Sequence, residues 1–116
     1  MHTKQKGNIA FSAVIYILHK NGFNVFSEIG DYSKVDLIAE KNGVFKKIQV
    51  KYCEEVNGAI KVPIRKSGPN GYRYTYTKTD IDWFAAYNPK TSNVYWIKAS
   101  IACKRKSAFT IREKNT

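Results

Sequence analysis

Cysteine, histidine and long hydrophobic runs are all scarce in this sequence. Its 116 residues include two cysteines, Cys53 and Cys103, and two histidines. None of the four has a Cys or His partner at the spacing of a zinc site, so we expect neither bound zinc nor a disulfide framework. The most apolar run near the N-terminus, residues 9–18, is interrupted by Ser12 and followed by His-Lys. It is too short and too polar for a signal peptide or a membrane span, and we expect a soluble intracellular protein with no membrane partner.

Acidic residues are also scarce. Nine Asp and Glu stand against 20 Lys and Arg, which gives a formal net charge of +11. The imbalance is concentrated in residues 59–116, where twelve basic side chains accompany three acidic ones. Such an excess is typical of proteins that bind nucleic acid, because neutralised phosphates release condensed counterions. The alternative is a solvated basic face that serves only solubility.

The hydrophobic pattern predicts one domain, residues 1–116, of the α+β class. We expect a helix from its N-cap Asn8 to about Lys20, where apolar residues recur at helical spacing and Gly22 follows. Strands are expected at residues 24–26, 35–40, 44–52, 59–64, 83–87 and 94–97, and an irregular basic segment at residues 65–79. The tail from Lys104 is predicted to be a last strand or a frayed helix. This order indicates a mixed or antiparallel sheet.

A predicted hairpin places a carboxylate beside a polar-x-Lys sequence. The turn signal Asn42-Gly43 joins a strand that begins near Asp36 to the strand that contains Gln49-Val50-Lys51. Gln49 and Lys51 share one strand face, and the backbone carbonyl of Val50 lies between them. Oxygen atoms of this kind suit Mg²⁺, and a nearby ammonium suits a reacting phosphodiester. The spacing alone is a weak signal, because a Lys on a strand is usually only solvated.

Five segments, taken in order, carry a resemblance to a known family. They are Lys6-Gly7-Asn8-Ile9-Ala10, Gly30-Asp31-Tyr32-Ser33-Lys34-Val35-Asp36-Leu37-Ile38, Ile48-Gln49-Val50-Lys51, residues 82–89 and residues 94–97. Together they resemble the core of PD-(D/E)-x-K nucleases, closest to the homing endonucleases encoded by group I introns of bacteria. The resemblance implies a mixed sheet flanked by helices and sequence-specific hydrolysis of double-stranded DNA. It also implies a homo-oligomer that works beside DNA in a bacterial or organellar cytoplasm.

The resemblance also implies roles for individual residues. Asp36 matches the metal-binding Asp of the family, and Mg²⁺ is the expected cofactor. Gln49 matches the position of the second acid, which this subgroup often fills with Gln. Lys51 matches the catalytic Lys, and the carbonyl of Val50 is the expected backbone ligand.

One position departs from the family pattern. The first helix of such nucleases usually carries a Glu just after Lys-Gly-x-x-(Gly/Ala), but this chain has Phe11 there. An aromatic ring can neither bind a metal nor accept a proton, so either Glu28, Asp31 or Glu40 substitutes, or the chain cuts poorly. The structural interpretation of Phe11 is a core residue packed under the sheet.

A second group of candidate functional residues is basic and rich in tyrosine. The candidate DNA contacts in it are Lys61, Arg65, Lys66, Tyr72, Arg73, Tyr74 and Tyr76. The alternation in residues 72–76 suits a ribbon that could enter a groove, with Arg contacting bases and Tyr contacting phosphate or sugar. It is also ordinary for a β-strand. Lys104 and Arg105 are expected to contact phosphates without sequence preference, or to form a solvated tail.

Three other functions remain open on the sequence. Phe11 favours a DNA-binding module on a decayed nuclease fold, and a Holliday-junction resolvase would share the same core. A basic RNA-associated protein would explain the charge but not the arrangement of Asp36, Gln49 and Lys51. We also expect a homo-dimer or homo-tetramer, because a strand-cutting site handles one backbone at a time. One or two of five clustered aromatic residues are expected at the subunit contact: Trp83, Phe84, Tyr87, Tyr95 and Trp96.

Overall fold

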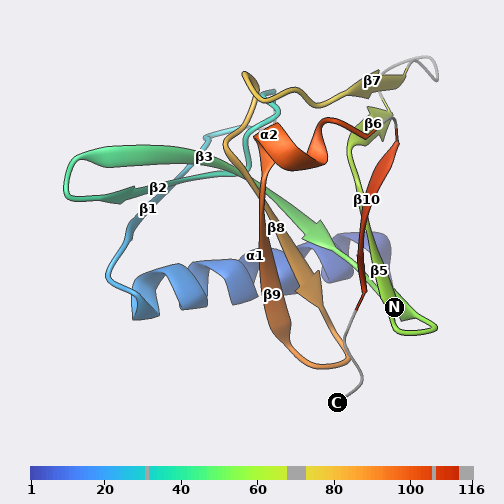
Figure 1. Cartoon of the computed structure of the whole chain (residues 1–116). Helices are drawn as coiled ribbons and strands as arrows, with labels where there is room; N and C mark the ends of the chain where they lie inside the picture. Colours follow the sequence, from blue (N-terminus) through green and yellow to red (C-terminus); the bar gives the residue numbers. More distant parts are fainter. Residues whose placement is uncertain (31, 68–72, 106, 113–116) are drawn as a thin grey trace.

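The computed structural model describes residues 1–30, 32–67, 73–105 and 107–112. The chain begins with helix α1 (Thr3–Lys20), and a short helix α2 (Ala99–Ala102) lies near its end (Figure 1). The strands are β1 (Asn24–Ser27), β2 (Leu37–Lys41), β3 (Val44–Tyr52), β4 (Glu55–Val56), β5 (Ala59–Pro63), β6 (Arg65–Ser67), β7 (Arg73–Thr75), β8 (Trp83–Asn88), β9 (Asn93–Lys98) and β10 (Ala108–Arg112). None of the helices in the described part of the chain is long and apolar enough to cross a membrane.

The central sheet is mixed. Its order is β1-β2-β3-β8-β9, with β3 and β8 parallel and the other neighbours antiparallel. The connection from β3 to β8 contains β4 and β5, which form a second sheet with β10, and the two-stranded ribbon β6–β7. The prediction of an α+β fold with a mixed sheet is confirmed.

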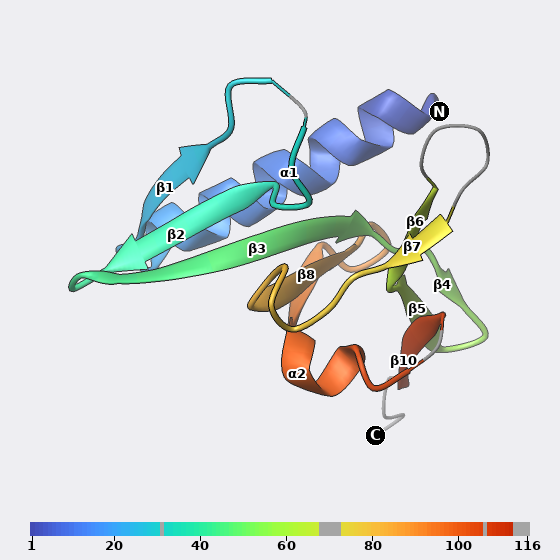
Figure 2. The same cartoon turned by 90° about the horizontal axis from the view of Figure 1, so that it is seen from above.

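Two hydrophobic clusters cover the two faces of the central sheet. On one face, Val14 and Leu18 of α1 pack with Leu37 and Ile48 of the sheet. On the other face, Phe84 packs with residues of β5 and with α2. Figure 2 shows α1 on one side of β3 and β8, and β5, β10 and α2 on the other. Neighbouring residues of a strand point to opposite faces. The continuous apolar run of β8 therefore serves both clusters, because this strand is covered on both sides.

The first helix begins earlier than the sequence indicated. The predicted N-cap was Asn8, but α1 starts at Thr3 and His2 is its N-cap. The Nδ1 atom of His2 accepts a hydrogen bond from the backbone of Lys4, and Gln5 accepts one from the backbone of His2. This reciprocal pair is a capping box with histidine in place of the usual Ser or Thr, and it stabilises two extra turns. The C-terminal boundary at Lys20 is confirmed.

The hairpin that carries the candidate site forms as predicted. Asn42 and Gly43 both have positive φ, 54° and 81°, which a tight two-residue turn of this type requires. The turn fixes the register, with Lys41 opposite Val44 and Leu37 opposite Ile48. The strand β2 starts at Leu37 rather than at Val35, so Asp36 lies just before it.

The basic segment is more regular than the sequence suggested. Residues 65–79 were predicted to be irregular, but β6 and β7 pair within them, with Arg65 opposite Thr75 and Ser67 opposite Arg73. Of the ribbon predicted from the alternation of residues 72–76, Arg73–Thr75 form β7, Tyr76 follows that strand, and Tyr72 lies outside the described residues. The tail forms β10, which pairs with β5, so the strand alternative for it was right. The strand β4 and the helix α2 had no counterpart in the sequence prediction.

The packing predicts a large difference between two phenylalanines of the central sheet. Phe84 is completely buried and meets Tyr76 edge to face, whereas Phe45 is 61% exposed. We expect Phe84→Ala to lower the free energy of unfolding by about 3–5 kcal/mol, since it leaves a cavity in the core. The matched control Phe45→Ala should cost less than about 1 kcal/mol, as exposed positions do. Urea unfolding of both variants measures this, and equal losses would contradict the assigned core.

Candidate functional site

Asp36 occupies an irregular point at the start of β2. A regular ladder would place it opposite Gln49, but its backbone N–H donates to the carbonyl of Ile48 at 2.9 Å. Leu37 also pairs with Ile48, so two consecutive residues meet one residue of β3, as in a β-bulge. Bulges re-aim side chains and are common next to active sites. Here the Oδ2 atom of the Asp36 carboxylate accepts the backbone N–H of Val50 at 2.8 Å, which ties it to the middle of the Gln49-Val50-Lys51 sequence.

Gln49 is a buried polar residue on the central strand. It is 6% exposed and lies between β2 and β8, opposite Phe84 of β8. Its Oε1 atom has no hydrogen-bond partner among the residues that the structure describes. An unsatisfied buried acceptor costs about 1–3 kcal/mol, so such an atom in a folded protein calls for an explanation. A cation or a water held at this position would supply the missing partner.

Lys51 lies two residues further along the same strand and on the same face as Gln49. Its Nζ atom is 5.0 Å from the centre of the Tyr76 ring, within the range of a cation–π contact. Tyr76 is completely buried, so it cannot contact DNA in this structure. Its prediction as a DNA contact is therefore wrong, and the ring instead packs against the ammonium of Lys51.

A second carboxylate lies close to Asp36. Glu28, just after β1, lines a cavity of about 290 Å³ together with Asp36. Its Oε2 atom accepts hydrogen bonds from the backbone and the hydroxyl of Ser33. Glu40 lies toward the other end of β2, where hydrogen bonds from Asn24 and from the backbone of Gly43 lower its pKa. Glu28 is thus the better placed substitute for the missing helix carboxylate.

Asp31, the third substitute that the sequence offered, lies outside the described residues. Within the residues that are described, no group of three or more His, Cys, Asp or Glu side chains is arranged to hold a metal ion. Among the described residues, the oxygen atoms that a metal ion could use here are therefore those of Asp36 and one further carboxylate, together with backbone or amide oxygens and water. Mg²⁺ commonly accepts such a mixture, because it keeps several of its waters when it binds to proteins.

Comparison with known proteins identifies the family of this chain. The family model described as PD-(D/E)XK endonuclease matches residues 1–116. The chain belongs to the PD-(D/E)XK endonuclease family. A solved structure of a bacterial homing endonuclease, I-Ssp6803I, is similar to this endonuclease-family chain with a TM-score of 0.83 and 28% sequence identity. The match covers 100% of this chain and 80% of that one. A search of curated proteins found no match to residues 1–116 of this chain.

Phe11 has a structural role in this member of the endonuclease family. It is partly buried and packs against the cluster that contains Val14, Leu37 and Ile48. The interpretation of Phe11 as a core residue under the sheet is thus correct in part, because the ring packs against the core but is itself only half-buried. Val50 of β3 packs against the same cluster. The Phe11 ring therefore lies on the face of the sheet that α1 covers.

The thiol next to the site has no evident chemical role. Cys53 follows β3 and is 3% exposed. Burial raises the pKa of its thiol to about 11, and the nearby ammonium of Lys51 offsets part of that rise. A thiol with so high a pKa stays protonated at neutral pH and is a poor nucleophile or metal ligand.

Apart from Tyr76, the predicted DNA contacts divide into three groups. Lys61, Arg65, Lys104 and Arg105 are exposed, as a role in binding requires. The backbones of Lys66, Arg73 and Tyr74 lie in the ribbon β6–β7, which extends from one end of the molecule in Figure 1. Tyr72 lies outside the described residues. The ribbon thus groups several candidates, while Lys61 lies on β5 and Lys104 and Arg105 follow α2.

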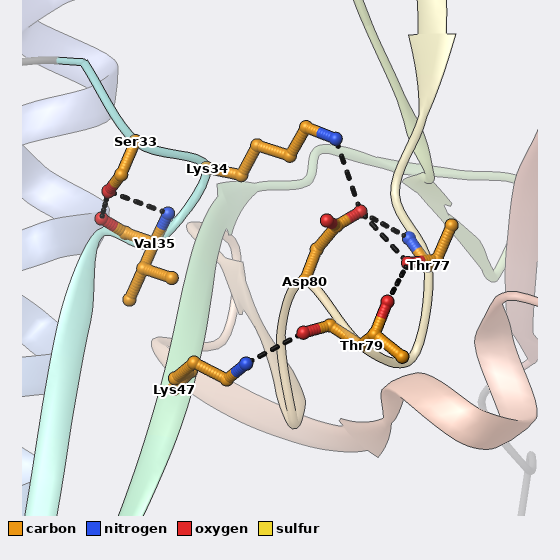
Figure 3. Close-up of polar contacts among 7 residues, drawn as sticks. All are labelled: Ser33, Lys34, Val35, Lys47, Thr77, Thr79 and Asp80. Atoms are coloured by element: carbon orange, nitrogen blue, oxygen red, sulfur yellow. Dashed lines mark hydrogen bonds and ion pairs between the residues drawn. The ribbon is translucent and has the colours of Figure 1, made fainter.

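The sequence prediction missed a network beside the site. The turn at residues 77–80 connects through Asp80 and Thr79 to Lys34 and Lys47 (Figure 3). A signal was present, because Thr77-x-x-Asp80 has the spacing of a capping box. The Asp80 carboxylate indeed accepts the backbone N–H of Thr77 at 2.8 Å. The distant partner of Asp80 could not be read from that motif.

Proposed function

We propose that this chain is a sequence-specific endonuclease of the homing type, which hydrolyses double-stranded DNA with Mg²⁺. The observation that carries the proposal is the arrangement around Val50. Its N–H binds the Asp36 carboxylate, and its neighbours on either side are the buried Gln49 and the Lys51 ammonium. A carboxylate just before β2 thus lies beside a cation and a buried oxygen on β3, and that oxygen has no hydrogen-bond partner among the described residues. This combination suits phosphodiester hydrolysis better than it suits a structural role.

The donor set fits a hard cation. Asp36 would hold Mg²⁺ through its carboxylate, and the carbonyl of Val50 would supply a second oxygen. The orphaned Oε1 atom of Gln49 would orient a ligand or a water. The chemistry that a bound Mg²⁺ supplies at such a site is activation of water and stabilisation of developing negative charge.

Lys51 contributes positive charge of its own. Its ammonium would stabilise the charge on the phosphate in the transition state, or position the attacking water. The Tyr76 ring beneath it restricts where that ammonium can go. A cation that is already oriented stabilises charge with little reorganisation, which is the usual source of electrostatic catalysis in enzymes.

A DNA-binding module on a decayed nuclease fold is the second candidate. Phe11 favours it, because the family position normally filled by Glu is apolar here and packs against the core. In that case DNA binding through the basic residues persists while hydrolysis is weak. We therefore propose that Phe11 lowers the activity of this chain.

The first prediction of this proposal concerns Phe11. Phe11→Glu should restore or raise Mg²⁺-dependent cleavage of DNA that contains the target site, by about tenfold or more, because it returns a carboxylate to the site. Cleavage of a genomic or plasmid library, followed on gels, measures this.

Two further variants act as controls for Phe11→Glu. Phe11→Gln removes the same aromatic packing without adding a charge, so it should lose similar stability but gain no activity. Phe11→Glu combined with Asp36→Asn should bind DNA within about tenfold of the parent yet not cut, since one carboxylate acts on the chemistry rather than on phosphate contacts. Cleavage that survives Asp36→Asn would overturn the site assignment.

A second prediction separates residues that contact bases from residues that contact phosphates. Arg65→Ala and Arg73→Ala in the ribbon should each cost about 1–3 kcal/mol on the specific site and relax the preference at one base position. Lys104→Ala and Arg105→Ala should instead weaken binding to all sequences alike and reduce the salt slope by about one unit. Gel-shift titrations at several salt concentrations give both quantities. A parent salt slope near zero would contradict the electrostatic argument.

The third prediction concerns assembly. Of the aromatic residues expected at a contact, Phe84 and Tyr87 are buried, whereas Trp96 is 36% exposed. Trp96 lines an open groove of about 570 Å³ with Trp83, Phe23 and apolar residues of α1 and the β2–β3 hairpin. We propose that this groove contributes to a homo-dimer or homo-tetramer. Light scattering at micromolar concentration should report that assembly, and Trp96→Glu should shift it toward monomer. A parent that stays monomeric on its DNA would instead indicate a nicking enzyme or a simple binder.

A further inference from the structure

The turn before β8 contacts β3 and the segment that precedes β2. Its Asp80 carboxylate accepts a hydrogen bond from the backbone N–H of Thr77 at 2.8 Å and one from the Thr77 hydroxyl at 3.0 Å. The same Oδ2 atom forms an ion pair with the Nζ atom of Lys34 at 3.2 Å. Figure 3 shows Lys34 reaching across from the segment before β2 to this carboxylate. Asp80 therefore joins two segments that are 46 residues apart in the sequence.

The turn is also anchored to β3. The Nζ atom of Lys47 donates to the carbonyl of Thr79 at 2.7 Å (Figure 3). Just beyond the turn, Asp82 and Lys47 form two hydrogen bonds, both at 2.8 Å. The backbone N–H of Lys47 donates to the carboxylate of Asp82, and the backbone N–H of Asp82 donates to the carbonyl of Lys47. Lys34 lies two residues before Asp36, and Lys47 lies two residues before Gln49. Through Lys34 and Lys47, the turn thus contacts the residues that come shortly before Asp36 and Gln49 in the chain.

The bond between Asp80 and Lys34 is partly buried. The side chains are 23% and 36% exposed, respectively. Burial by itself would raise the pKa of the Asp80 carboxyl, but hydrogen bonds from Thr77 and the contact with Lys34 outweigh it and lower the pKa. The carboxylate is therefore charged at neutral pH. The Asp36 segment needs such an anchor, because the bulge before β2 leaves it outside the regular ladder of hydrogen bonds.

We propose that Asp80 is a positioning residue, which acts through Lys34 to fix Asp36 relative to Gln49 and Lys51. The inference rests on the proposed function, since it assumes that Asp36 binds a metal ion. Productive geometry at such sites must be held to about half an ångström by supporting residues. Loss of a partner that orients a ligand typically weakens metal binding by about 10–100-fold.

Binding of Mn²⁺ to the full chain without DNA tests the proposal independently of cleavage. Electron paramagnetic resonance of free Mn²⁺ during a titration gives the dissociation constant. Asp80→Asn keeps the size of the side chain and removes its charge, and Lys34→Gln removes the other partner while leaving the bonds to Thr77. Each should weaken Mn²⁺ binding about tenfold. The double variant should be no weaker than either single one, because both remove the same ion pair.

Lys90→Gln is the matched control. It breaks an ion pair of similar length, 3.1 Å from Lys90 to Glu55, and removes the same charge as Lys34→Gln, but at residues outside the proposed site. Its Mn²⁺ affinity should equal that of the parent. Thermal unfolding of every variant shows whether a loss of Mn²⁺ affinity merely follows a loss of stability. If it does, Lys90→Gln and Lys34→Gln will lose Mn²⁺ affinity alike, and that result would refute the positioning role.

Asp36→Asn separates failure of this inference from failure of the proposed function. If Asp36→Asn loses Mn²⁺ while Asp80→Asn and Lys34→Gln bind it as tightly as the parent, Asp80 is not a positioning residue and the metal site stands. If Asp36→Asn binds Mn²⁺ as well as the parent does, the metal site itself is wrong and the role of Asp80 falls with it.

Discussion

The pairing of β3 with β2 on one edge and with β8 on the other determines the rest of this molecule. The β2–β3 turn sets the register on the first edge. The parallel pairing on the second edge requires a long crossover, and the chain uses it to build the second sheet and the ribbon. Because α1 covers one face of the sheet and the second sheet covers the other, the middle of β3 is buried at Ile48 and Gln49. A polar side chain such as Gln49 at that point is then either functional or costly to the stability of the fold.

The polar groups around this strand are organised in two layers. The inner layer consists of the Asp36 carboxylate on the Val50 N–H, the amide of Gln49 and the ammonium of Lys51 over the Tyr76 ring. The outer layer is the turn at residues 77–80, which bonds to Lys34 before β2 and to Lys47 of β3. Rigid surroundings of this kind lower the reorganisation that a reaction needs, which is why catalytic residues on strands are usually supported by a second set of bonds.

Phe11 shows how packing and chemistry compete at one position. The same helix face that buries Val14 and Leu18 also presents residue 11 to the sheet. An aromatic residue there adds buried apolar area, which stabilises the fold, but it supplies no oxygen atom that could bind a metal ion. Glu28 shares a cavity with Asp36, and it is the residue through which this chain could retain chemistry without a helix carboxylate.

The sequence by itself determined the class of the fold, the β2–β3 hairpin, the place of Gln49 and Lys51 on the second strand of that hairpin, and the place of Asp36 near the start of the first. These features follow from local signals: the Asn42-Gly43 turn, strand alternation and ordered motifs. The start of α1 was misplaced because His2 is an unusual cap. Tyr76 was misassigned because alternation marks a strand but not which of its faces is buried. Only the tertiary structure could reveal the bulge at Asp36, the orphaned oxygen of Gln49 and the bond from Asp80 to Lys34. Those depend on contacts between segments far apart in the chain, and neither periodicity nor local spacing encodes such contacts.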